Sequence, residues 1–169
     1  MMAASTKKIR IGEVGAAIGT TPKALRHWIS RYGERGVGPT AEQTGEWLEF
    51  SWGDVAALAI THYLVNLGMP AFASFAVAME IVKKRWPDLF NADEPKWKTE
   101  TSNSMMFLYL NRDGNWGFGS FEKFSSVSVE PDSRALVTLA VAPIVLDAFE
   151  ALEEMGHTKP QRDNGEKKN

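Results

Sequence analysis

Basic and hydroxyl side chains gather in one short stretch near the start of the chain, a combination suited to binding a polyanion. In "GTTPKALRHWISR" two threonines precede a proline, and lysine, arginine and histidine follow at short intervals. Lysine and arginine neutralise phosphates, while hydroxyl groups and the free N–H groups of a helix start fix the register of a protein on a nucleic acid. The candidate contacts are Thr20, Thr21, Lys23, Arg26, His27 and Arg31, with Lys7, Lys8 and Arg10 upstream.

Two short helices are expected to position these side chains. Gly19 favours the left-handed conformation that ends a first helix over residues 12–18, and Thr21 with Pro22 is a strong signal for the start of a second, which runs to about Arg31. Apolar residues at three- and four-residue spacing predict that each helix buries one face. They are Val14, Ala17 and Ile18 in the first helix and Leu25, Trp28 and Ile29 in the second.

The next segment predicts a hairpin followed by a long helix. Residues 33–51, "GERGVGPTAEQTGEWLEFS", are rich in glycine and turn residues and end in an alternating pattern, which indicates a small hairpin, or wing. Ser51 and Asp54 form a capping-box pattern at the start of a helix that Gly68 ends.

A further helix is expected to start at Pro70 and to be stopped by Pro87. Its large apolar side chains recur at three- and four-residue spacing, so they are either core or a surface for self-association. They are Phe72, Phe75, Met79, Val82 and Trp86. The polar residues 88–103 are interpreted as a linker.

Beyond the linker the apolar pattern is that of strands. Pairs of apolar segments flank two turns, at residues 112–115 and 131–133, and a helix is expected from Pro143 to Gly156. This predicts a four-stranded antiparallel β-meander with one covering helix; a single helix over 132–155, kinked at the proline, is the alternative. Large side chains of the strands either line a small effector pocket or form cross-strand pairs: Met105, Phe107, Tyr109, Trp116 and Phe118. The glycines of "GNWGFGSF" are interpreted as strand glycines and not as a phosphate loop.

The predicted fold class is therefore α+β in two domains. Residues 7–87 are expected to form a winged helix-turn-helix with its following helices, and 88–103 the linker. Residues 104–156 are expected to form an antiparallel sheet with a helix, serving regulation or oligomerisation, and 157–169 a charged, disordered tail.

Composition narrows the function classes. The 169 residues include no cysteine, which excludes disulfides, thiolate metal sites and cysteine nucleophiles and favours a cytoplasmic protein. No apolar run approaches the roughly 20 residues that cross a bilayer. The net charge is only −2, but the charges are unevenly distributed along the sequence. Residues 7–35 include seven lysines and arginines and only two acidic residues, whereas acidic residues outnumber basic ones from Asp88 onward.

Enzymatic chemistry is not predicted. His27, His62 and His157 are far apart and lack metal-ligand spacing, so we expect no metal site and no cofactor, and we interpret His62 as a structural histidine. Three acidic residues near the last helix end are interpreted as a solvated face: Glu150, Glu153 and Glu154.

Short motifs occur in a fixed order along residues 8–82. They are Ile11-Gly12-Glu13-Val14, Gly19-Thr20-Thr21-Pro22, Leu25-Arg26-His27-Trp28, Asp54-Val55 with Leu58, and Leu67-Gly68. In this order they resemble the N-terminal pattern of the MerR family of winged helix-turn-helix regulators, and the resemblance covers roughly the first half of this chain. The resemblance implies that Arg26 and His27 approach the sugar-phosphate backbone, and that Thr21 and Lys23 lie at the groove.

The chain departs from that family in three places. The family's wing carries an arginine before a tyrosine to grip phosphate, whereas residues 46–50 are "EWLEF". Either Arg31, Arg35 or another part of the chain compensates for the acidic wing, or the wing serves another partner. Nothing after Pro87 resembles the family's coiled-coil dimerisation helix, and the cysteines of its metal-sensing members are absent.

These observations predict a DNA-binding transcriptional regulator that is cytoplasmic and nucleoid-associated. Its expected partners are double-stranded DNA, a second copy of the chain and, through the C-terminal domain, RNA polymerase or another protein; no membrane contact is expected. The alternatives are a phage or mobile-element adaptor for DNA packaging or excision, and a protein–protein interaction module.

Overall fold

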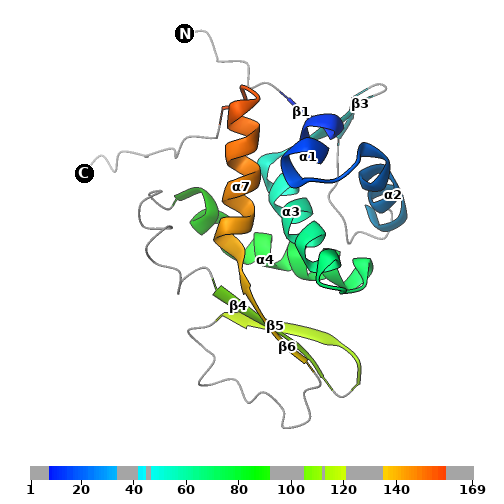
Figure 1. The fold of residues 1–169 in the computed structure, drawn as a ribbon, viewed down its shortest axis with the longest axis vertical. Helices are drawn as coiled ribbons and strands as arrows, with labels where there is room; N and C mark the ends of the chain where they lie inside the picture. Colours follow the sequence, from blue (N-terminus) through cyan, green and yellow to red (C-terminus); the bar gives the residue numbers. More distant parts are fainter. Residues whose placement is uncertain are drawn as a thin grey trace, which may run out of the picture.

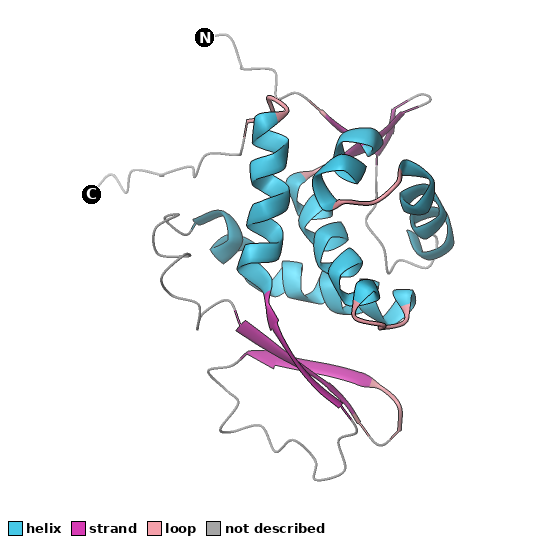
Figure 2. Cartoon of the chain, in the orientation of Figure 1, coloured by secondary structure: helices cyan, strands magenta, loops and turns pink. Residues whose placement is uncertain are grey.

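The protein is an α+β fold of helices and two small antiparallel sheets (Figures 1 and 2). A computed structural model describes residues 8–33, 42–44, 47–91, 105–111, 113–120 and 135–158. In chain order its elements are β1 Ile9–Arg10, α1 Ile11–Ile18, α2 Pro22–Gly33, β2 Glu42–Thr44, β3 Trp47–Phe50, α3 Trp52–Asn66, α4 Ala71–Asn91, β4 Met105–Leu110, β5 Trp116–Ser120, β6 Ala135–Ala140 and α7 Val141–Glu154.

Local signals in the sequence account for most helix ends. Ser51 is the N-cap of α3: its hydroxyl accepts a hydrogen bond from the Asp54 N–H at 3.2 Å, and the Asp54 carboxylate accepts one from the Ser51 N–H at 2.9 Å. Gly19 and Gly68 have φ values of 72° and 90°, so α1 and α3 are each followed by a left-handed glycine, as predicted.

The first sheet holds the segment before α1 beside the predicted hairpin. Its strand order is β1-β3-β2, with Ile9 opposite Phe50 and Gln43 opposite Leu48. The antiparallel pairing of β2 with β3 confirms the hairpin, although its turn, residues 45–46, lies outside the described residues.

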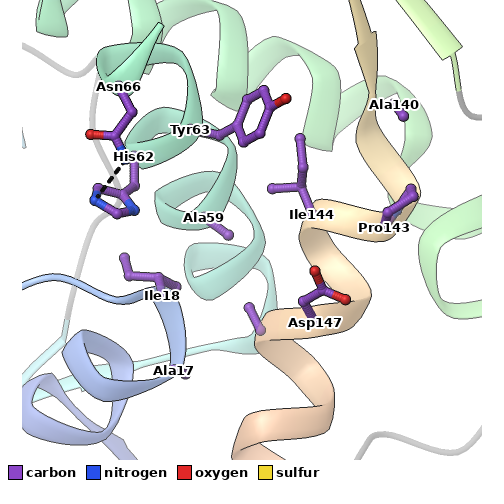
Figure 3. A pocket seen from close by; sticks show the side chains of 11 residues that line it. Ala17, Ile18, Ala59, His62, Tyr63, Asn66, Ala140, Pro143, Ile144 and Asp147 are labelled. Carbon is purple, nitrogen blue, oxygen red and sulfur yellow. Dashed lines mark hydrogen bonds between the residues drawn. The ribbon is translucent and has the colours of Figure 1, made fainter.

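Helix α3 is the centre of the hydrophobic core. Its residues from Val55 to Thr61 are all buried, because α1, α4 and α7 pack around it. Figure 3 shows side chains of α1, α3 and α7 facing one another. At the start of α3 the Trp52 ring meets Phe149 of α7 edge-on, with 4.8 Å between ring centroids. One hydrophobic cluster therefore joins elements from both predicted domains.

The second sheet corrects the predicted meander. Its strand order is β5-β4-β6, so β6 pairs with β4, the first strand of this sheet in the chain, and β4 is the central strand among those described. Strand β4 is paired on both edges, and its Leu108 is fully buried because it belongs to the hydrophobic core. The fourth predicted strand is β6, and the third, which precedes the predicted turn at 131–133, falls within residues 121–134, outside the described part of the chain.

The hairpin of this sheet and its strand glycines are confirmed. The Asn111 N–H donates to the Asn115 carbonyl at 2.9 Å, and Gly114 has a φ of 79° between them. Gly117 faces Tyr109 across β4 and β5, and a Cβ at this glycine would collide with the tyrosine ring. An aromatic side chain thus covers the glycine, which explains the residue without a phosphate loop.

Strand β6 leads directly into α7, so the alternative of one long helix over 132–155 is wrong. Predicting α7 as the cover of the second sheet was also incomplete. The helix extends away from the sheet and packs on α3 and α1, because its buried face carries Val145, Phe149 and Leu152 (Figure 1).

The predicted stop at Pro87 is wrong as well. Helix α4 continues through this residue to Asn91, and so takes in the first residues of the predicted linker. A proline lacks one N–H donor and clashes with the preceding turn, but the residues after it keep their own donors. One further turn of helix is therefore possible. The rest of the linker, 92–103, lies outside the described residues.

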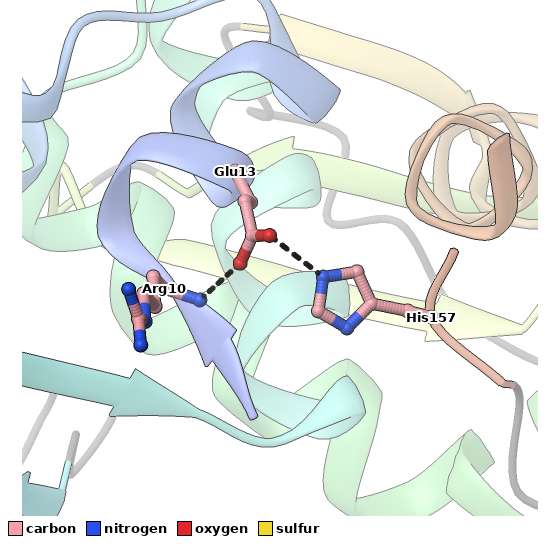
Figure 4. A network of polar contacts seen from close by, with 3 residues as sticks. All are labelled: Arg10, Glu13 and His157. Atoms are coloured by element: carbon pink, nitrogen blue, oxygen red, sulfur yellow. Dashed lines mark hydrogen bonds and ion pairs between the residues drawn. The ribbon is translucent and has the colours of Figure 1, made fainter. Parts of the chain in front are cut away.

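His157 corrects the prediction that the tail starts at this residue. Its ring is buried, with 4 % of the residue exposed, and its Nε2 lies 3.2 Å from Oε1 of Glu13 in α1. The other carboxylate oxygen of Glu13 accepts a hydrogen bond from the Arg10 N–H at 2.9 Å (Figure 4). The His157–Glu13 contact has an ion-pair distance but not the alignment of a hydrogen bond. It fastens the end of α7 to the start of α1.

Replacing His157 with alanine is expected to lower the free energy of unfolding by about 1–3 kcal/mol, because it leaves a cavity and removes a polar partner of Glu13. Urea denaturation followed by circular dichroism measures this change. The matched control is Thr158→Ala, since Thr158 is the exposed next residue and should have little effect. Equal midpoints for the two variants would contradict a fastening role.

Candidate nucleic-acid interface

The turn between α1 and α2 is closed by backbone contacts that leave little free space. The Thr20 N–H donates to the Gly15 carbonyl at 2.8 Å. Thr21 is exposed just before α2, and its Oγ1 accepts a hydrogen bond from the Ala24 N–H at 3.2 Å, the contact of an N-cap. The predicted cap at Thr21 and helix start at Pro22 are therefore confirmed.

The inner face of α2 is anchored by aromatic contacts. Leu25 is fully buried, and the Trp28 ring meets Phe75 of α4 edge-on at 5.9 Å between centroids. Tyr32 lies over the same Phe75 at 5.4 Å and beside Phe72 at 6.2 Å. Part of the apolar stripe on α4 is thus covered by α2, and the interpretation as core holds for Phe75.

The outer face of α2 carries the predicted basic residues. Lys23, Arg26, His27 and Arg31 are all exposed, with Ser30 among them. Their spacing places Lys23, Arg26, His27 and Ser30 along one side of the helix, opposite Leu25 and Trp28. No described residue forms an ion pair with Lys23 or Arg26. The Arg31 guanidinium lies 5.9 Å from the Tyr32 ring centroid, a contact that leaves its charge exposed.

The upstream cations are placed differently. Lys8 is exposed and forms an ion pair with Glu49 of β3, so it offsets an acidic residue of the hairpin. Arg10 is exposed at the end of β1, opposite Glu49 in the sheet register. Thr20 is half-buried in the turn, while Lys7 and Arg35 lie outside the described residues. The structure therefore brings four predicted residues together on α2 and sets Lys8 and Arg10 on the sheet.

Sequence reasoning missed how His62 is placed. It is half-buried on α3, its ring lies 6.3 Å from Trp28, and its Nε2 is 3.3 Å from the Asn66 amide nitrogen. The four-residue spacing of His62 and Asn66 on one helix is a signal from which their contact could have been predicted. The sequence holds no local signal for the contact with Trp28, which belongs to another helix.

Neither a cluster of metal ligands nor a membrane-spanning helix occurs among the described residues. Within this part of the chain no three histidine, aspartate or glutamate side chains gather as metal ligands. Among the helices whose placement is described, none combines the length and the apolar run needed to span a bilayer.

The comparisons with known proteins add no family. No protein-family model matches the sequence, and no curated protein is significantly similar to it.

Gly15→Ala is expected to lower the free energy of unfolding by about 1–3 kcal/mol through overpacking. Its Cβ would lie 2.8 Å from the Thr20 carbonyl oxygen, so the turn before α2 would have to shift. The matched control is Gly12→Ala in the same helix, where a Cβ has nothing within 4 Å. Because alanine favours helix, the control should be neutral or stabilising. Thermal denaturation compares the two, and equal effects would contradict the tight turn.

Proposed function

We propose that the protein is a cytoplasmic, nucleoid-associated transcriptional regulator that binds double-stranded DNA through a MerR-like winged helix-turn-helix. In this proposal α1 and α2 are the helix pair, α2 enters the major groove, and β2 with β3 forms the wing. One observation carries it: the exposed basic face of α2, held outward because the opposite face is packed into the core.

The amphipathic division of α2 supports this function. Phosphate binding requires several unpaired cations on one side of a helix. A helix that is merely solvated has no such requirement. Lys23 and Arg26 reach solvent within the first turns of the helix, and the anchored ring of Trp28 fixes the rotation of the helix about its axis. The exposed Thr21 adds a hydroxyl beside the helix N-terminus, where the dipole favours a phosphate.

The charge on the hairpin supports contact through α2 more than through the wing. Glu42 stands opposite Glu49 in the β2–β3 register, and Lys8 pairs with Glu49. Since Lys8 reduces the negative charge there, the hairpin can approach a duplex with less repulsion than its sequence implies. Groove contacts are then assigned to Thr21 and Lys23, and contacts with the sugar-phosphate backbone to Arg26, His27 and Arg31.

A homodimer forms part of the proposal, since a two-fold dimer reads two half-sites. Two large apolar side chains outside the pocket between α1, α3 and α7 remain exposed where α3 ends and α4 begins: Leu67 at 51 % and Phe72 at 46 %. They support self-association at this corner. The second sheet with α7 would then be available to RNA polymerase or another protein.

Arg26→Ala is expected to weaken binding to a mixed-sequence duplex and to reduce the slope of log K against log salt by about 0.9, the value for one phosphate. Fluorescence anisotropy over a range of salt concentrations measures both quantities. The matched control is Lys83→Ala, which removes an exposed cation of α4 that is not on α2. The fold should be unaffected in both variants.

Two results would contradict the proposal. Wild-type protein that binds no duplex at low salt would remove DNA binding altogether. An unchanged salt slope in Arg26→Ala, or an equal reduction in Lys83→Ala, would show that the face of α2 is not the contact surface.

A further inference from the structure

A half-open groove of about 350 Å³ lies between α1, α3 and α7, away from the outer face of α2 (Figure 3). This volume falls at the lower end of the range for small-molecule sites. The groove exists because alanines stand where these helices meet: Ala17 on α1, Ala59 on α3 and Ala148 on α7. Larger side chains there would fill the space.

The wall of the groove combines an aromatic ring with one charge. Tyr63 of α3 and Ile144 of α7 supply apolar surface, and 43 % of Tyr63 is exposed. Asp147 is the one acidic side chain among the lining residues, none of which is lysine or arginine, and all of these residues are described. In Figure 3 its carboxylate lies on the α7 side, facing the space below Tyr63 and Ile144.

We propose that this groove binds a small organic cation, namely an apolar chain or ring that carries one protonated amine. The apolar part lies over the alanines and against Tyr63, where it loses contact with water. The ammonium group pairs with Asp147 at the edge of the groove, where it keeps part of its hydration. A carboxylate ligand is disfavoured, because it would meet Asp147 with like charge and no lysine or arginine lines the groove.

The position of His62 suggests a consequence for α2. The same imidazole lines the groove, lies beside Trp28, and has its Cε1 4.0 Å from where a Cβ on Gly19 would stand. A ligand that contacts His62 therefore acts on the turn before α2 and on the ring that anchors α2. That this changes DNA affinity rests on the proposed function; the binding of the amine does not.

Three probes of similar size and different charge test the site: 2-phenylethylamine, 2-phenylethanol and phenylacetate. Each is titrated into the full chain while ¹H–¹⁵N spectra are recorded. The amine should shift the amide signals of Ala17, His62 and Asn66 with a dissociation constant on the order of millimolar, as for a ligand of few atoms. The alcohol should bind several-fold more weakly and phenylacetate more weakly still.

Asp147→Asn is the decisive variant, because it keeps the shape of the side chain and lies on an exposed part of α7. It should weaken amine binding about fivefold, the effect of one partly exposed ion pair, and leave alcohol binding unchanged. The matched control is Glu153→Gln, an exposed carboxylate of the same helix outside the groove, which should leave amine affinity unchanged.

Several outcomes would overturn the proposal. One is equal affinity for all three probes, and another is a set of amide shifts confined to residues outside the groove. The others are an equal loss of amine affinity in Asp147→Asn and Glu153→Gln, and contacts from a second copy of the chain to the groove in the free protein. A failure to bind DNA would leave the groove assignment intact, since the titration contains no DNA. If amine binds and DNA binding is present, anisotropy with and without amine measures the coupling.

Discussion

The burial of one face of α2 against α4 is the interaction on which the basic surface depends. A helix of twelve residues is marginal alone, because nucleation costs more than so few backbone hydrogen bonds return. Leu25, Trp28 and Tyr32 supply the missing stabilisation, and Phe75 is shared by both aromatic rings. The same contacts determine which side of the helix faces solvent. The contacts that stabilise α2 are therefore the same contacts that keep its basic side chains exposed.

Helix α7 makes this arrangement dependent on the end of the chain. It packs on α3 and α1, and His157 just beyond it reaches Glu13 at the start of α1. Glu13 also accepts the Arg10 N–H, so one carboxylate connects β1, α1 and the segment after α7. The helix pair at the start of the chain is thus supported by residues more than a hundred positions away.

Sequence reasoning succeeded where the signal is local and failed where it is distant. The caps at Thr21 and Ser51 and the left-handed Gly19 and Gly68 act within a few residues, so their patterns predicted the helix ends. The pairing of β6 with β4 brings together strands separated by more than twenty residues, and no turn motif encodes it. His157 stands in a polar segment without periodicity, so nothing local distinguished a buried histidine from a solvated one. Of the candidate interface, the residues of α2 were predictable and the placement of His62 was not.

The central position of α3 limits how a ligand in the groove can affect α2. A helix buried on nearly all sides cannot shift without disturbing the packing around it, since protein interiors are close-packed. In the proposed coupling, a ligand in the groove acts first on lining side chains that are only half-buried. His62 is such a residue, and its neighbours Gly19 and Trp28 belong to the turn and to α2. In the proposed coupling, His62 is therefore the lining residue through which a ligand in the groove acts on α2.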